Sequence, residues 1–307
     1  MKPQGKGEAG GKVILMGEHA VVYGEPALAL PFNDVRVRIT VEPASTYTLT
    51  SDVYHGNLTD DEGLTRPMMV LLRRLDERLQ TGPLKVVVDG DIPIHAGLGS
   101  SAAVAAALTS ACYNLMDEPL DDEDHIEWVQ VAEKIAHGNP SGVDATTVVK
   151  RRPVLFVKGE GVMTMTLSLP GYFVVGFSGI PGQTKRAVAK IAGVYANEAT
   201  KSHLRALGQL TTMAVSFDHA SDPERFGELM SEAHKRLQAL GVTSKALDNM
   251  VHGAMASGAL GAKMTGGGLG GSVIAYADTK EAADAVRAYF TRSTDEPAWV
   301  MRSGVTT

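Results

Sequence analysis

An α+β fold in two domains is the class that the sequence predicts, and three observations lead to it. The chain has 307 residues, which at ~150 residues per domain corresponds to two domains. Strand-like and helix-like segments both occur, but they do not alternate one for one as in a doubly wound sheet. Hydrophobic residues make up 44% and charged residues 21%, as in an ordinary globular chain. We expect the boundary near Leu169–Pro170, between the domains 1–169 and 170–307.

The first half of the chain is expected to combine strands with helices. Residues 33–42 alternate apolar and polar side chains, which is typical of a half-buried strand, and residues 47–50 are expected to pair with it. Pro67 precedes apolar residues at helical spacing, which indicates the first turn of a helix. The expected strands are 12–16, 33–42, 47–50 and 84–88, and the expected helices are 67–80, an alanine-rich helix ending near Met116, and 121–136.

The second half is expected to begin with a hairpin and to continue with a run of helices. Residues 154–157 and 163–167 form the two strands of the hairpin, which turns around Gly159. A strand over 172–178 follows the proposed boundary. The remaining expected elements are helical patterns at 184–197, 201–219, 223–239 and 244–258, a strand at 272–277 and a helix at 280–290.

Charge and cysteine content exclude several classes of protein. The chain carries 29 Lys and Arg against 35 Asp and Glu, a net charge of −6, which gives no overall attraction to nucleic acid or to an anionic membrane. Cys112 is the single cysteine, so a disulfide scaffold and a cysteine zinc site are excluded. The longest apolar stretch, 102–116, is too short and too polar to span a bilayer, and the first residues show no signal peptide. We therefore expect a cytoplasmic protein.

A glycine-rich loop at 97–103 precedes the alanine-rich helix. Such a loop leaves backbone N–H groups that point at an anion, and glycine lets a phosphate approach the backbone closely. Ser100 and Ser101 are expected to cap the helix, and a serine hydroxyl also suits the Mg²⁺ that accompanies ATP. The alternatives are an N-cap without a ligand and a dinucleotide turn of the pattern G-x-G-x-x-A. The residues between the preceding strand and Gly97 count against the dinucleotide turn.

Two further segments carry candidate chemistry. Residues 137–144 are dense in turn residues and end at Asp144, while Glu133 lies one helical turn before His137. A carboxylate held by a rigid turn suits the base of a phosphoryl transfer. Taken by itself, however, this segment is better explained as a polar helix–turn–helix connection with Asp144 as an N-cap. Residues 266–271 hold five glycines in six positions, which indicates either a close approach to the backbone or a flexible loop.

A fourth segment, 12–24, places Lys12 before a short strand and Glu18 and His19 after it. Alone, it reads as an ordinary strand and turn. Two glycine loops, a serine pair, a glutamate and an aspartate together fit ATP-dependent phosphoryl transfer. Protein-kinase motifs are absent from the sequence.

The four segments also resemble the motifs of a known family. KVILMGEHAVVYG (12–24), PIHAGLGSSAA (93–103), HGNPSGVD (137–144) and KMTGGGLGG (263–271) are similar, in order and spacing, to the motifs of the GHMP small-molecule kinases. The first and third together resemble the branch whose acceptor is mevalonate. The compact length and AHGNPSGVDATT followed by a short hairpin resemble the prokaryotic members of that branch. The resemblance implies phosphorylation of the C5 hydroxyl of (R)-mevalonate by ATP, a step of isoprenoid synthesis. It also implies a ribosomal-S5-domain-2-like N-terminal domain and a ferredoxin-like C-terminal domain, with the active site in the cleft between them.

The resemblance further implies residue roles. Asp144 would accept the proton of the C5 hydroxyl, and Lys12 would pair with Asp144 and polarise that hydroxyl. Ser101 and Glu133 would hold Mg²⁺. The ATP triphosphate would be bound by the loop residues Pro93, Ala96, Gly97, Leu98, Gly99, Ser100, Ser101 and Ala102.

On the acceptor side, the resemblance implies substrate contacts for Glu18, His19 and Thr184, with His19 near the carboxylate or the C3 hydroxyl of mevalonate. ATP and mevalonate would be the partners, without nucleic acid or membrane, and homodimers are common in the family. His95 departs from the family pattern, which usually has a small residue there. The competing hypotheses are a GHMP kinase for another alcohol, a dinucleotide-binding oxidoreductase and a non-catalytic ATP-binding regulator.

Overall fold

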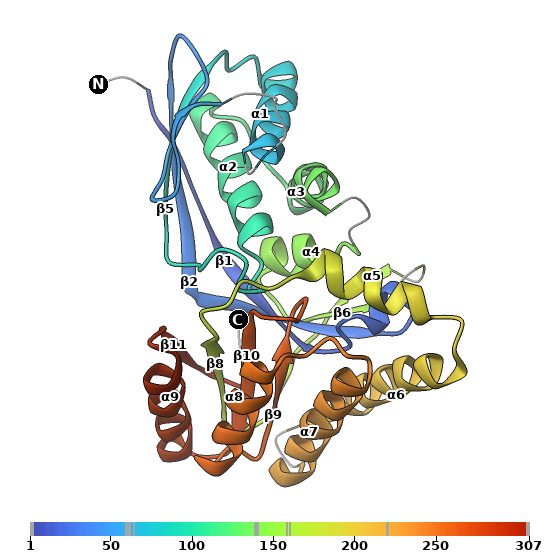
Figure 1. The fold of residues 1–307 in the computed structure, drawn as a ribbon. Helices are drawn as coiled ribbons and strands as arrows, with labels where there is room; N and C mark the ends of the chain where they lie inside the picture. The colour runs from blue at the N-terminus through green and yellow to red at the C-terminus, as the bar shows by residue number, and fades with distance from the viewer. Residues whose placement is uncertain are drawn as a thin grey trace. The chain divides into compact units, whose positions relative to one another are not determined.

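Strands of the molecule lie in two sheets (Figure 1). The computed structural model describes residues 3–58, 63, 65–137, 141–157, 159, 161–218 and 221–304. Within them, a seven-stranded sheet has the order β4-β3-β5-β2-β6-β7 with β1 beside β2, and a four-stranded sheet has the order β11-β8-β10-β9. The strands are β1 (Gly5–Met16), β2 (Ala27–Pro43), β3 (Thr48–Thr50), β4 (His55–Asn57), β5 (Leu84–Gly90), β6 (Val154–Val157), β7 (Gly161–Thr164), β8 (Tyr172–Phe177), β9 (Gly261–Thr265), β10 (Ser272–Ala277) and β11 (Ala298–Arg302).

Helices occupy much of the remaining chain. A short 3-10 helix, η1 (Ala20–Tyr23), follows β1. The α-helices are α1 (Arg66–Leu79), α2 (Ser100–Met116), α3 (Asp122–His137), α4 (Val143–Lys150), α5 (Thr184–Val194), α6 (Glu198–Val215), α7 (Pro223–Ala239), α8 (Lys245–Ala256) and α9 (Lys280–Thr294). Within the described part of the chain, no helix combines the length and the apolar content that crossing a membrane requires.

The chain forms two units whose segments alternate along the sequence. Unit 1 consists of Met1–Lys12, Asn33–Ile92 and Gly99–Arg151, and unit 2 consists of Val13–Phe32, Pro93–Leu98 and Arg152–Thr307. Strands β1 and β2 therefore contribute residues to both units. The expected boundary near Leu169–Pro170 lies within unit 2, and it stays a prediction about domain organisation.

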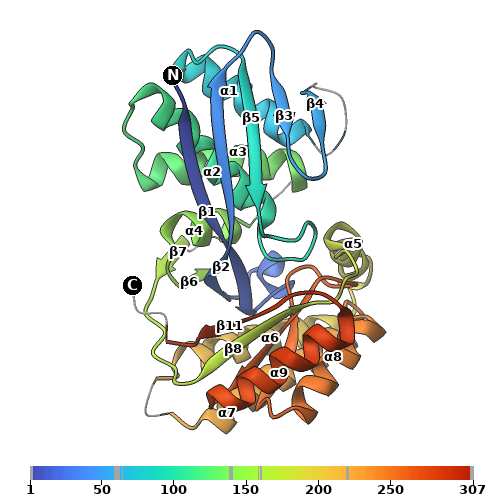
Figure 2. The same cartoon turned by 90° about the vertical axis from the view of Figure 1, so that its left-hand side faces the viewer.

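In unit 1, helices α1, α2 and α3 lie on one face of strands β1, β2 and β5 (Figures 1 and 2). Helix α2 is alanine-rich and buried on most sides. Gly5 and Gly7 on β1 face it so closely that a Cβ atom at either position would overlap a carbonyl oxygen of α2. The glycine-rich start of the chain is therefore a strand, which allows β1 and α2 to pack backbone against backbone.

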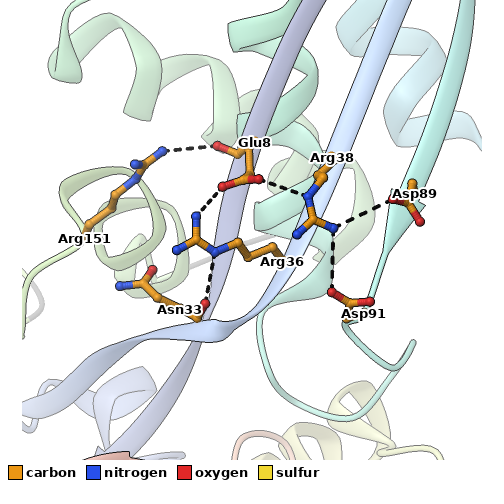
Figure 3. Close-up of polar contacts among 7 residues, drawn as sticks. All are labelled: Glu8, Asn33, Arg36, Arg38, Asp89, Asp91 and Arg151. Atoms are coloured by element: carbon orange, nitrogen blue, oxygen red, sulfur yellow. Dashed lines mark hydrogen bonds and ion pairs between the residues drawn. The ribbon is translucent and has the colours of Figure 1, made fainter.

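The other face of these strands carries a network of ion pairs centred on Glu8 of β1 (Figure 3). Arg36 and Arg38 of β2 both donate to the Glu8 carboxylate, and hydrogen bonding from Arg36 holds the pKa of Glu8 below its ordinary value. Arg38 also lies 3.8 Å from a carboxylate oxygen of Asp89 and of Asp91. Charged cross-strand pairs of this kind explain the alternation of polar and apolar residues that predicts β2.

Unit 2 contains the four-stranded antiparallel sheet, with helices α7, α8 and α9 packed against it (Figure 1). Taken in chain order, its strands have the spatial order 4-1-3-2, which is that of a ferredoxin-like sheet. Four of its helices begin at a residue whose side chain accepts a backbone N–H of the first turn. These residues are Asn197, Asp222, Ser244 and Thr279.

Several sequence predictions about local structure are corrected. Residues 48–50 pair with β4 and β5 and not with β2, because β5 occupies the edge of β2 along 37–43. The helix α4 and the strands β9 and β11 were not predicted, and β1 and β2 both start earlier than expected. The hairpin of β6 and β7 is confirmed, although β7 ends at Thr164.

Candidate active site

A buried lysine and a carboxylate meet in unit 1. Lys12 lies on β1 and is 3% exposed, and its Nζ atom lies 3.2 Å from Oδ1 of Asp144. Asp144 lies in the first turn of α4, after Gly142, and not at the N-cap. The N-terminus of α4 and the Lys12 ammonium therefore both present positive charge to the carboxylate.

Glu133 of α3 and Ser101 of α2 join this pair. Glu133 is 4% exposed, and the Ser101 hydroxyl donates a hydrogen bond to its carboxylate. Burial raises the pKa of Glu133 to about 7, and the charge of Asp144 acts in the same direction. Unit 1 thus brings together the four residues for which the resemblance implies catalysis or metal binding, while their roles stay predictions.

Gly99 supports the position of Lys12. It is the N-cap of α2, with a φ of 76°, and a Cβ atom at this position would lie 2.8 Å from Cγ of Lys12. The expectation that serine side chains cap α2 is wrong, because no side chain caps this helix and both serines lie in its first turn. Glycine is therefore required at position 99 both for its φ and for the close passage of the lysine.

The remaining loop residues of the predicted ATP site, Pro93–Leu98, belong to unit 2. The Ala96 carbonyl accepts a hydrogen bond of 2.9 Å from the Ser272 hydroxyl. His95 has a φ of 60°, and its carbonyl accepts a hydrogen bond of 2.8 Å from the N–H of Gly182. Of the predicted loop residues, Gly99, Ser100, Ser101 and Ala102 belong to unit 1.

A buried ion pair lies in unit 2. Lys263 of β9 is fully buried, and its Nζ atom donates to Glu18 Oε1 and, at 2.8 Å, to the Met264 carbonyl. Burial lowers the pKa of Lys263, while the neighbouring Glu18 carboxylate opposes that shift. Glu18 is 1% exposed. Its carboxylate is held by Lys263, which is far away in sequence.

His19 and Thr184 converge on Gly267 in the same unit. The His19 ring hydrogen-bonds the backbone of Gly267. A Cβ atom at Gly267 would overlap the hydroxyl of Thr184, the first residue of α5. Two predicted acceptor-side residues thus approach the backbone of the glycine segment 266–271. Of the two interpretations of this segment, the close approach to the backbone is the one that the structure supports.

Sequence reasoning assigned no individual role to Lys263 or Gly267, and it placed Gly99 in the phosphate loop without its contact to Lys12. The sequence signal that could have identified Lys263 as a buried residue is its position beside apolar residues. The turn residues 138–140 of the third motif lie outside the described residues. Two cavities of about 400 and 520 Å³ lie elsewhere in unit 1, and none of the predicted site residues lines either one.

Comparison with known proteins identifies the family. The model of the GHMP kinase N-terminal domain matches residues 66–151, and that of the GHMP kinase C-terminal domain matches residues 213–295. These matches contain Ser101, Glu133 and Asp144 in the first segment and Lys263 in the second. The chain therefore belongs to the GHMP kinase family, whose members use ATP.

Within the family, the chain groups with the mevalonate kinases. A mevalonate kinase of Pyrococcus furiosus is 33% identical over 305 residues, which cover 90% of each chain. The crystal structure of mevalonate kinase from methicillin-resistant Staphylococcus aureus is also 33% identical, with a TM-score of 0.76 over 99% of this chain and 100% of that chain. A structure of L. major mevalonate kinase in complex with R-mevalonate is 24% identical, with a TM-score of 0.81 over 100% of this chain and 99% of that chain, and shares the fold.

Proposed function

We propose that this chain transfers the γ-phosphoryl group of ATP to the C5 hydroxyl of (R)-mevalonate. Its relatives at 33% identity are mevalonate kinases, and the observation that carries the chemistry is the pairing of Lys12 with Asp144 at 3.2 Å beside Glu133 and Ser101. Phosphoryl transfer depends mostly on positioning and electrostatic stabilisation, and these side chains supply both.

Asp144 is the proton acceptor in this proposal. The O–H bond of the C5 hydroxyl breaks, and its proton moves to the Asp144 carboxylate. The hydroxyl oxygen forms a bond to the γ-phosphorus, the bond between that phosphorus and the β–γ bridging oxygen breaks, and ADP leaves. The Lys12 ammonium holds Asp144 in place and stabilises the negative charge that develops on the hydroxyl oxygen.

Mg²⁺ enters the proposal through Ser101 and Glu133. A hydroxyl and a carboxylate suit this ion, which prefers oxygen ligands and binds through one or two carboxylates together with substrate phosphates. The described residues contain no group of three or more His, Cys, Asp or Glu side chains that would hold a metal ion without a nucleotide. When bound, Mg²⁺ would neutralise charge on the phosphates and favour ionised Glu133.

The phosphates themselves are assigned to the start of α2. The first N–H groups of a helix have no partner within the helix, and together with the helix dipole they favour an anion. Gly99 and the absence of a capping side chain leave the backbone at this terminus accessible to a ligand. Glu18, His19 and Thr184 are assigned to the acceptor.

The direct test measures ADP release with Mg·ATP and (R)-mevalonate, beside galactose, homoserine and phosphomevalonate. Turnover confined to mevalonate is expected, and turnover confined to another alcohol would refute the assignment. Asp144→Asn is expected to lower kcat about 10²- to 10⁴-fold while ATP binding persists. The matched control is Asp89→Asn, whose 78% exposed side chain lies on the open face of unit 1. Near-normal kcat in Asp144→Asn would exclude Asp144 as the base.

A further inference from the structure

Helix α7 packs against β9, which is an edge strand of the four-stranded sheet in the described part of unit 2. The two elements come so close that a Cβ atom at Gly261 of β9 would overlap the carbonyl oxygen of Gly227 of α7. An edge strand has backbone N–H and C=O groups that no neighbouring strand bonds. Where such a strand is buried, these groups need partners from side chains.

Both backbone polar groups of Met264, a buried residue of β9, are bonded by side chains. The Met264 N–H donates a hydrogen bond of 3.3 Å to Nδ1 of His234, a residue of α7 that is 4% exposed. The Met264 carbonyl accepts the bond of 2.8 Å from Lys263 Nζ. Nε2 of His234 lies 3.2 Å from Oδ1 of Asp248 on α8. A continuous chain of polar contacts therefore runs from α8 through α7 and β9 to Glu18, and all of it lies within unit 2.

These contacts define the state of the His234 ring. Because Nδ1 accepts a bond, the proton of the neutral ring lies on Nε2, which donates it to the Asp248 carboxylate. Burial lowers the pKa of His234 below its ordinary value, the charge of Asp248 opposes this shift, and the charge of Lys263 adds to it. The ring is therefore neutral at neutral pH, and each of its nitrogens has a partner.

The bond from Met264 matters because of the peptide group to which it belongs. This N–H is part of the planar group between Lys263 and Met264, so its direction and the position of Lys263 on β9 are linked. A buried N–H that loses its acceptor is costly, which favours a rotation of this peptide group toward another acceptor. Such a rotation would move the lysine backbone and weaken its contact with Glu18.

We propose that His234 is a positioning residue, which holds Met264 through Nδ1 and thereby keeps Lys263 placed to fix the Glu18 carboxylate. Glu18 is assigned to the acceptor, so the effect of His234 on the reaction rests on the proposed function. Loss of the Met264 bond is expected to weaken binding of the acceptor. ATP binding should not change, because Glu18 has no assigned contact with ATP.

Two variants separate the nitrogens of the ring. His234→Asn keeps an acceptor oxygen near Nδ1 and gives up the contact with Asp248, whereas His234→Gln reaches Asp248 and lacks an acceptor near Nδ1. Each variant loses one polar contact, so urea unfolding should show similar losses of stability in both. His252→Asn, at an exposed histidine of α8, is the matched control.

The KM for mevalonate distinguishes the two variants. His234→Gln is expected to raise it about tenfold at an unchanged KM for ATP, while His234→Asn stays within about twofold of wild type. In wild type, this KM should also rise at acidic pH, because protonated Nδ1 no longer accepts a bond, and His234→Asn should lack this rise. Equal KM values for mevalonate in the two variants, a KM for ATP that changes in parallel, or the same pH dependence in wild type and His234→Asn would overturn the proposal.

Two measurements do not depend on turnover. Nitrogen NMR of the free protein should show the proton of His234 on Nε2, and a proton on Nδ1 at neutral pH would overturn the proposal. Hydrogen exchange of the Met264 amide should be faster in His234→Gln than in His234→Asn, and equal rates would overturn it as well. If the chain phosphorylates another alcohol in place of mevalonate, the proposed function fails, and the same comparison of KM values with that alcohol decides the role of His234.

Discussion

Replacing Gly99 by alanine should damage both stability and catalysis, because the new Cβ atom meets Lys12. Carbon atoms pack at about 3.5–4.0 Å, whereas this Cβ atom would lie 2.8 Å from Cγ of Lys12, so the lysine must move by about 1 Å. Alanine at positive φ costs about 1–2 kcal/mol, and overpacking adds about 1–3 kcal/mol. The expected loss of unfolding free energy is therefore about 2–5 kcal/mol. A shift of about 1 Å in the Lys12–Asp144 pair should lower kcat about 10²-fold.

Gly82 supplies the matched control for this experiment. Its φ is 66°, and nothing lies within 4 Å of a Cβ atom added there, so Gly82→Ala reports the backbone cost alone. Urea unfolding and steady-state turnover are measured for both variants. The reasoning is refuted if Gly99→Ala and Gly82→Ala lose equal stability, or if Gly99→Ala keeps kcat within about twofold of wild type.

Two further predictions concern buried charge. Because the pKa of Glu133 rises from 4.5 to about 7 on folding, the folded chain binds this proton more tightly, and stability is lost as pH rises through that window. Without Mg²⁺, Glu133→Gln should therefore be more stable than wild type by on the order of 3 kcal/mol at a pH above this window, and equally stable at a pH below it. Urea unfolding at one pH on each side of the window checks this. A difference in stability that does not change with pH would contradict it. Lys263→Met should lower the free energy of unfolding by about 3–5 kcal/mol, because it leaves Glu18 charged and buried. The double variant Lys263→Met with Glu18→Gln should recover much of that loss. Additive losses in the double-mutant cycle would show that the two side chains are not coupled.

Elements whose state is decided by near neighbours in sequence are predicted well. Helical periodicity places α1, α3, α7 and α8 within one or two residues of their observed ends. Apolar residues at helical spacing, a proline in the first turn of a helix and acidic residues at its start are all local signals. The two-domain α+β class follows from the same signals, and the family comparisons agree with it.

The missed elements depend on partners that are distant in sequence. Strand β9 does not look apolar because it contains Lys263, and this lysine can be buried there only because Glu18 neutralises it. The first residues of β1 look like a loop until α2 supplies the backbone against which Gly5 and Gly7 pack. The pairing of residues 48–50 likewise depends on β5, which no local pattern links to them.

In the candidate site, too, local sequence patterns predict some features, and contacts between distant residues decide the others. Motif glycines and polar residues identified the neighbourhood, and the resemblance supplied the pairing of Lys12 with Asp144, which the structure brings to 3.2 Å. The raised pKa of Glu133 and the bonding of the His19 ring were not predictable, because each depends on burial and on groups from several elements.

The alternation of units along the chain has a consequence for synthesis on the ribosome. Residues 13–32 emerge early, yet they belong to unit 2, most of which is translated after residue 152. Glu18 is separated from Lys263 by 245 residues, so at about 5–20 residues per second its partner follows roughly 12–50 s later. During that interval the apolar end of β1 is exposed while unit 1 is already being completed. Chaperone binding to the nascent chain should therefore be concentrated on this N-terminal segment and end when β9 leaves the exit tunnel.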